Sequence, residues 1–193
     1  MSRTSSLYRI AWIFYLFLAL GGLVGLAAEG RRVDLELLVR PASWWIDVGL
    51  GLLCGAVLLA AWVGIRKLVP AAVELEEILA RLIGPVGRDE LAALALISAL
   101  AEEIAFRGAL QSVAGVVVAA LVFALLHLGP GTAFRLWSGY ALVGGLVFGG
   151  VTLYRHGALA AAIIGHLVVN LVQLRRIAAL PAGGDTAGLP LDA

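Results

Sequence analysis

Residues 91–115 have the sequence LAALALISALAEEIAFRGALQSVAG, and this stretch decides the fold. Eleven uncharged residues precede Glu102, and no Asp, Glu, Lys or Arg occurs between Arg107 and Arg135. The pattern predicts a membrane-spanning helix that carries Glu102, Glu103 and Arg107. Charged side chains inside a membrane cost about 2.5–3.5 kcal/mol each on insertion scales, and they usually face a bundle interior or a water-filled cavity. We therefore expect these charges to have a function.

The composition is that of an integral membrane protein. Of 193 residues, 62% are hydrophobic and 14% are charged, and the mean hydropathy is +1.00. Soluble domains have about 45–50% apolar and about 25% charged residues. The net charge of +1 excludes nucleic-acid binding, and the single cysteine excludes an intrachain disulfide or a thiolate metal site. The Ala- and Gly-rich composition favours a prokaryotic inner membrane.

Apolar runs predict an all-α transmembrane bundle of about six spans; all but the short fourth are close to the roughly 20 residues that cross a bilayer core. The expected spans are 10–28, 44–65, 91–115, 116–128, 136–154 and 157–174. A cleaved signal peptide is the alternative for the first, but its apolar run exceeds the usual apolar core of about 7–15 residues. We therefore expect residues 1–28 to be retained.

Two further patterns concern packing. Between 73 and 90, apolar residues alternate with Glu74, Glu76, Glu77 and Arg81, which predicts an amphipathic helix on the membrane surface. We expect a connector there rather than a gate. Glycines four residues apart at 21 and 25, 51 and 55, and 145 and 149 favour close helix packing inside the bundle over a dimer interface.

Helix geometry separates the three charges of the opening stretch. Glu103 and Arg107 are at positions i and i+4, so they can pair on one face. Glu102 is rotated by about 100° and has no such cation on its own helix. It is therefore the carboxylate left to accept a proton. The structural alternative is that all three charges hold helices together.

The later spans carry histidines. His127 follows Phe123 by one turn, and a lone histidine there is more often a packing residue than a catalyst. His166 and Asn170 lie at i and i+4 and can form interhelical hydrogen bonds or donate to an oxyanion. Together with Glu102 they could enclose a water and a scissile carbonyl. Ser98, Ser112 and Ser138 lack histidine partners along their helices, which disfavours a serine nucleophile.

These elements resemble the CPBP family of intramembrane proteases, which includes the type II CAAX prenyl endopeptidases (Rce1-like) and Abi-type relatives. The resemblance covers roughly residues 90–176. It rests on E-E-x-x-x-R at Glu102, Glu103 and Arg107, F-x-x-x-H at Phe123 and His127, and H-x-x-x-N at His166 and Asn170.

The resemblance implies a glutamic-type mechanism. Glu102 with His127 would activate a water, and His166 with Asn170 would stabilise the oxyanion. Glu103, Arg107 and Phe123 would support the site. No cofactor is expected, although a zinc ion held by Glu102, His127 and His166 is the alternative.

The sequence thus predicts an intramembrane endopeptidase that acts on a membrane protein or peptide substrate within the lipid bilayer. Residues 1–89 would hold two transmembrane helices and the amphipathic connector, 90–178 a catalytic four-helix core, and 179–193 a disordered tail. Nine Lys or Arg on one side against four on the other place both termini in the cytoplasm. A non-catalytic membrane scaffold or immunity protein is the alternative.

Overall fold

The computed structural model describes residues 6–180, and its regular elements in that range are all helical, as expected. The predicted tail at 179–193 lies almost entirely outside the described residues. The elements are α1 (Ser6–Ala28), α2 (Leu35–Leu38), η1 (Pro41–Ser43), α3 (Trp44–Leu68), α4 (Pro70–Ile83), α5 (Arg88–Glu102), η2 (Glu103–Leu110), α6 (Gln111–Leu125), α7 (Gly131–Tyr154) and α8 (Ala160–Ala178).

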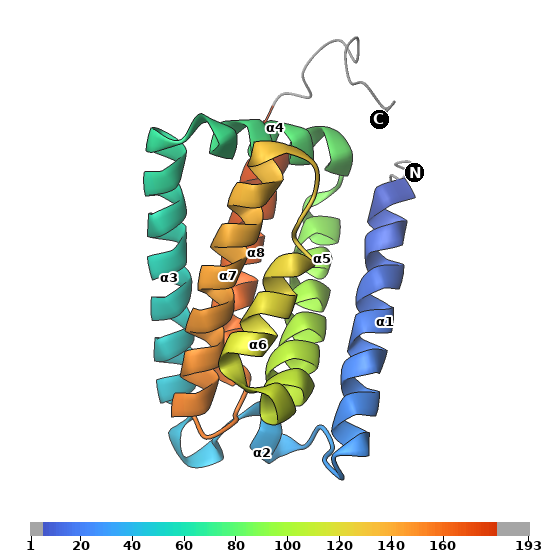
Figure 1. Ribbon diagram of the computed structural model, residues 1–193, viewed down its shortest axis with the longest axis vertical. Helices are drawn as coiled ribbons and strands as arrows, with labels where there is room; N and C mark the ends of the chain where they lie inside the picture. Colours follow the sequence, from blue (N-terminus) through green and yellow to red (C-terminus); the bar gives the residue numbers. More distant parts are fainter. Residues whose placement is uncertain (1–5, 181–193) are drawn as a thin grey trace.

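The long helices run up and down to form one bundle, with α4 lying across one end (Figure 1). Helix α3 packs against α8, α6 against α7, and α1 against α5 and η2. The start of α1 and the end of α8 lie at the same end as α4 (Figure 1). Five helical stretches within the described residues are long and apolar enough to cross a membrane. The protein is therefore an integral membrane protein.

The expected fourth span, 116–128, forms a helix that does not cross the whole membrane core. One apolar helical stretch covers Arg88–Leu125, but Gly115 interrupts it with a φ of 81°. The chain reverses there, so that α6 runs back beside α5 (Figure 1). From Gly115 to its end at Leu125, α6 rises about 15 Å, which is half of a roughly 30 Å membrane core. An irregular segment then leads to α7. The bundle therefore has five full spans and one half-length helix.

The helix widens into π-helical hydrogen bonding where the charges lie, from Glu103 to Leu110. Such turns are rare and are frequent at functional sites. Helix α1 packs closely here, because a Cβ added at Gly22 would lie 2.8 Å from the Ala105 Cα.

Glycines let other helices approach as closely. A Cβ at Gly51 would lie 2.7 Å from the Ala161 carbonyl oxygen, and one at Gly149 would lie 2.8 Å from Gln111 Oε1. The pairs 51/55 and 145/149 therefore serve internal packing, as predicted. Gly21 has no neighbour within 4 Å, so in the first pair only Gly25 is used.

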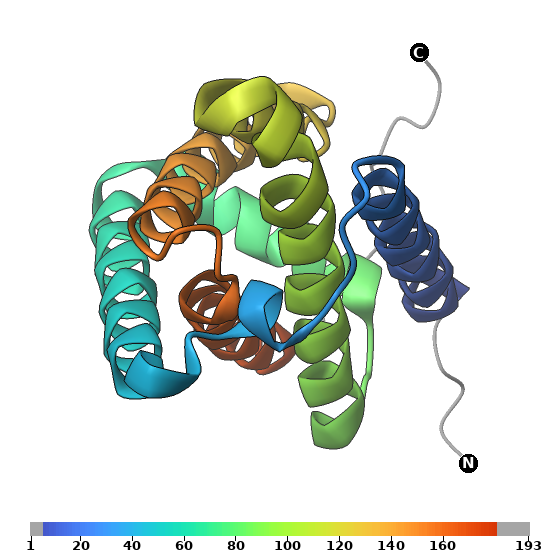
Figure 2. The same cartoon turned by 90° about the horizontal axis from the view of Figure 1, so that it is seen from below.

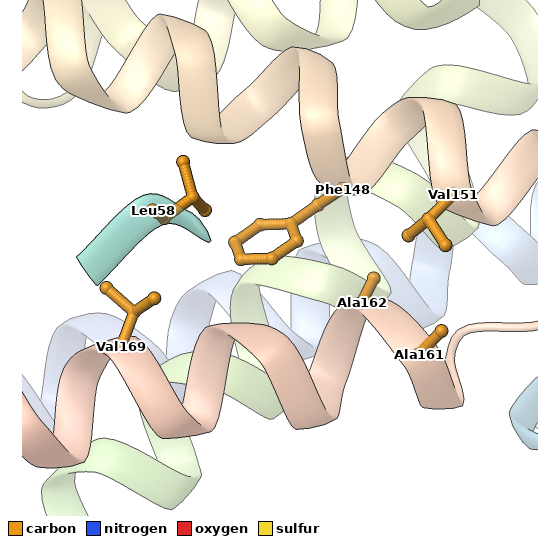
Figure 3. Packing of buried hydrophobic residues seen from close by; sticks show 6 residues of the cluster. All are labelled: Leu58, Phe148, Val151, Ala161, Ala162 and Val169. Carbon is orange, nitrogen blue, oxygen red and sulfur yellow. The ribbon is translucent and has the colours of Figure 1, made fainter. Parts of the chain in front are cut away.

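An apolar cluster joins α3, α7 and α8 in the middle of the bundle. Its central ring, Phe148, projects from α7 between the other two helices (Figure 3). The buried members are Leu58, Phe148, Val151, Ala161, Ala162 and Val169.

The connection between α1 and α3 closes the end of the bundle opposite α4. Viewed from that end, α2 lies beside the start of α8 (Figure 2). Leu37 packs with Leu26, Ala109 and Leu159, and the Leu159 amide donates to the Leu37 carbonyl at 2.9 Å. This end is therefore sealed by apolar contacts.

Helix α4 forms in the predicted amphipathic segment but ends at Ile83, where Gly84 has a φ of 65°. One of its expected surface charges is buried instead. Glu76 accepts hydrogen bonds from Trp62 Nε1 at 2.9 Å and Arg66 Nε at 2.8 Å, and lies 3.5 Å from Arg176 Nη2. These contacts attach α4 to α3 and α8.

Candidate active site

A cavity of about 440 Å³ lies within the bundle beneath α4. Most of its wall is apolar or aromatic, with side chains from α1, α3, α4, α5, α7 and α8. The predicted residues Glu102, His127, His166 and Asn170 all line it. The structure thus brings together, from three segments of the chain, the four polar groups expected to act in concert.

The expected pair between Glu103 and Arg107 forms. Arg107 Nε lies 3.2 Å from Glu103 Oε2, and both side chains are almost fully buried. The guanidinium also lies over the Phe123 ring, 4.6 Å from its centroid, a cation–π contact that is stronger when desolvated. Phe123 thereby supports the charge pair as well as the segment that carries His127.

His166 bridges the two adjacent glutamates. Its Nδ1 lies 2.7 Å from Glu103 Oε1, and its Nε2 lies 3.3 Å from Glu102 Oε2. The imidazole stacks on Phe148 with a centroid distance of 5.3 Å. The expectation that Glu102 has no partner was therefore incomplete, because it considered only the helix that carries Glu102.

The partners of His166 determine where its protons lie. Glu103, paired with Arg107, accepts a hydrogen bond, so Nδ1 carries a proton. In a neutral imidazole Nε2 would then hold a lone pair facing the Glu102 carboxylate. At 3.3 Å, His166 Nε2 and Glu102 Oε2 are close enough to share a proton.

The backbone sets the tautomer of His127 in the same way. Its Nδ1 lies 2.8 Å from the Phe123 carbonyl oxygen, which can only accept. Nδ1 is therefore protonated, and Nε2 of the neutral ring is left with a lone pair. The ring packs against Phe123 and Trp137, with centroid distances of 4.6 and 5.0 Å. The spacing F-x-x-x-H thus orients a basic nitrogen.

Asn170 has a partner that the sequence patterns did not indicate. Its Nδ2 donates to Ser98 Oγ at 2.9 Å, and Ser98 donates to the Ala95 carbonyl at 3.0 Å. Only one sequence feature could have indicated a role for Ser98: it lies four residues before Glu102, on the same helix face. Tyr15 of α1 also lines the cavity and lies close to Ser98 and Glu102.

The alternative zinc site does not assemble. Among the described residues, no three His, Cys, Asp or Glu side chains converge as a ligand set. Only Glu102 and His166 of the expected three are in contact. A catalytic zinc site usually has three protein ligands, so this donor set does not fit the ion.

Comparison with known proteins agrees with this geometry. Residues 90–172 match the family model of the type II CAAX prenyl endopeptidases, Rce1-like. No curated protein and no solved structure matches the chain. The matched segment contains all three motifs and every predicted site residue, and the resemblance is confirmed. Residues 90–172 of this integral membrane protein are therefore similar to the Rce1-like family of type II CAAX prenyl endopeptidases.

Proposed function

We propose that the protein is an intramembrane endopeptidase that hydrolyses a peptide bond of a membrane-associated protein or peptide. The observation that carries the proposal is that Glu102, His127, His166 and Asn170 line one cavity inside a membrane bundle. A polar, water-holding pocket with a base and oxyanion donors is what peptide hydrolysis in a membrane requires. The apolar and aromatic walls suit an apolar substrate, such as the prenylated CAAX ends in the family's name.

Water activation is assigned to Glu102 and His127. A water between them would donate one proton to the Glu102 carboxylate while the lone pair on His127 Nε2 accepts its second hydrogen. General bases of this kind contribute about 10²–10⁴-fold to rates. The water oxygen then bonds to the scissile carbonyl carbon.

The oxyanion that forms is assigned to His166 and Asn170. His166 is held by Glu103 through Nδ1, so a hydrogen on Nε2 would be directed toward Glu102 and the cavity. Asn170 supplies a second donor through Nδ2. When the tetrahedral intermediate collapses, the C–N bond breaks and the proton held by Glu102 passes to the leaving amine.

This mechanism needs no metal ion. We expect purified protein to keep its cleavage activity after dialysis against a chelator, measured with a fluorogenic prenylated CAAX peptide. Loss of activity on chelation and its return with zinc would favour the zinc-dependent alternative instead.

The cellular test does not require a known substrate. Cells lacking the protein would be complemented with the wild type, E102Q or the control H156N, and newly formed protein termini in their membranes would be mapped by mass spectrometry. His156 is exposed and outside the cavity, so H156N should restore the same termini as the wild type. E102Q should restore none. Identical termini in E102Q and wild-type cells would support a non-catalytic scaffold.

A further inference from the structure

Ser98 is buried beside the cavity and is not part of any motif that points to catalysis. We infer that Ser98 is a positioning residue that holds the Asn170 amide in one of its two orientations, with Nδ2 as the donor. Its effect on the reaction rests on the proposed function, but the orientation itself does not.

The argument begins with the single proton of the Ser98 hydroxyl. That proton is donated to the Ala95 carbonyl oxygen at 3.0 Å, and a carbonyl oxygen can only accept. While that bond is kept, Ser98 Oγ is an acceptor toward its other neighbours, which are the Asn170 amide and the Tyr15 hydroxyl. Asn170 Nδ2 meets Ser98 Oγ at 2.9 Å.

A side-chain amide can turn over, which exchanges its oxygen and nitrogen with little change in shape. If Asn170 did so, its Oδ1 would face Ser98 Oγ, and the hydroxyl would have to leave the Ala95 carbonyl to avoid an opposition of two acceptors. Loss of one hydrogen bond costs about 0.5–1.5 kcal/mol, enough to disfavour the turned-over amide by about 2- to 12-fold. Ser98 therefore selects the orientation with Nδ2 toward α5.

The selected orientation leaves the second Nδ2 hydrogen for a ligand in the cavity. A turned-over amide would move this donor, and an oxyanion is stabilised only by hydrogen-bond donors that point at it. Ser98 and Glu102 are at i and i+4 on α5, so one helix face carries the carboxylate and also fixes the donor from α8.

Asn170 is the only asparagine in the chain, which allows a direct spectroscopic test. Protein labelled with nitrogen-15 asparagine has a single asparagine side-chain amide, whose two proton signals can be followed by NMR in detergent micelles. In the wild type, we expect two well-separated signals, one of them protected from solvent exchange. In S98A, both should move toward the positions of free asparagine and lose protection.

The matched control is S112A. Ser112 Oγ also lies near a carbonyl three residues earlier, that of Ala109, but its hydroxyl donates to Glu29 and has no contact with Asn170. S112A should leave the Asn170 signals unchanged. Asn170 signals that are the same in S98A and the wild type would overturn the inference.

Kinetics with the fluorogenic prenylated CAAX peptide test the consequence. We expect S98A to lower kcat about tenfold with KM unchanged, S98T to restore it, and N170A to lose about 10²–10³-fold. Adding S98A to N170A should cost nothing more. If S98A lowered kcat as much in the N170A protein as in the wild type, this would contradict the inference that Ser98 acts through Asn170. A displaced amide with an unchanged cleavage rate would support the positioning and contradict the proposed role of Asn170 in catalysis.

Discussion

Two of the clusters of buried charge among the described residues differ in how completely their polar atoms are satisfied. At the sealed end, Asp47 pairs with Arg155 Nε and also accepts from the Arg40 amide. Arg155 Nη2 donates to Ser43 Oγ at 2.7 Å. None of these groups lines the cavity beneath α4.

The second cluster, around His166, leaves polar atoms unmatched. Arg107 Nη1 is buried without a hydrogen-bond partner, Glu103 Oε2 has only the ion pair with Arg107 Nε, and Glu102 faces the cavity. Each unsatisfied buried group costs about 1–3 kcal/mol, so such a cluster does not maximise stability. We therefore propose that the Asp47–Arg155 cluster serves folding and that the cluster around His166 serves chemistry. The following predictions test that division, from the largest expected effect to the smallest.

Apart from E102Q, the variant expected to lower cleavage most is H127A. Loss of the Nε2 lone pair should lower kcat by about 10²–10⁴-fold, the range for a positioned general base. Thermal unfolding in detergent should change little, because the ring is only half-buried. H156N is the control. A rate within twofold of the wild type would remove His127 from the site.

D47N should act in the opposite way. It leaves Arg155 buried without a counter-charge, and breaking a buried pair costs about 3–5 kcal/mol. We expect a clearly lower unfolding temperature and an unchanged kcat for the molecules that remain folded. An unfolding temperature equal to that of the wild type would show that the sealed end does not depend on this pair.

A smaller loss of stability is expected for E76Q. Glu76 accepts from Trp62 and Arg66, but the Arg66 side chain is 36% exposed and water can replace part of the contact. The expected cost is about 1–2 kcal/mol by thermal unfolding. The neighbouring variant E77Q, on the exposed face of α4, should have no effect. Equal effects of the two would mean that Glu76 does not attach α4 to the bundle.

The smallest effect concerns pH. The Ser112 hydroxyl donates to Glu29 at 2.7 Å and holds the pKa of that carboxyl below its ordinary value of 4.5. A lowered folded-state pKa adds stability above pH 4.5 that is lost as the pH falls through the lowered value. The difference in unfolding temperature between the wild type and S112A should therefore shrink below pH 4.5. A difference that grows in acid would contradict this sign.

The sequence alone predicted the features that depend on residues of a single helix. Apolar runs predicted the long helices, and the i, i+4 rule predicted the pair between Glu103 and Arg107. The motifs predicted the residues that meet at the cavity, because ordered spacing on neighbouring helices restricts which faces can converge.

Contacts between distant segments could not be predicted in the same way. The approach of His166 to Glu102 depends on how α8 packs against α5, and the burial of Glu76 depends on two arginines from other helices. The half-length α6 depends on the backbone of Gly115, where an apolar run gives no sign of a reversal. The irregular segment after α6 carries His127, which lines the cavity. Irregular backbone at membrane depth is tolerated at such places.

The unfolding temperature of E102Q tests the division between the two clusters most directly, and it needs no substrate. Glutamine keeps the shape of Glu102 but removes the charge beside the cavity. We predict an unfolding temperature equal to or above that of the wild type, together with complete loss of cleavage. An E102Q protein destabilised as much as D47N would contradict the account, because Glu102 would then serve the fold.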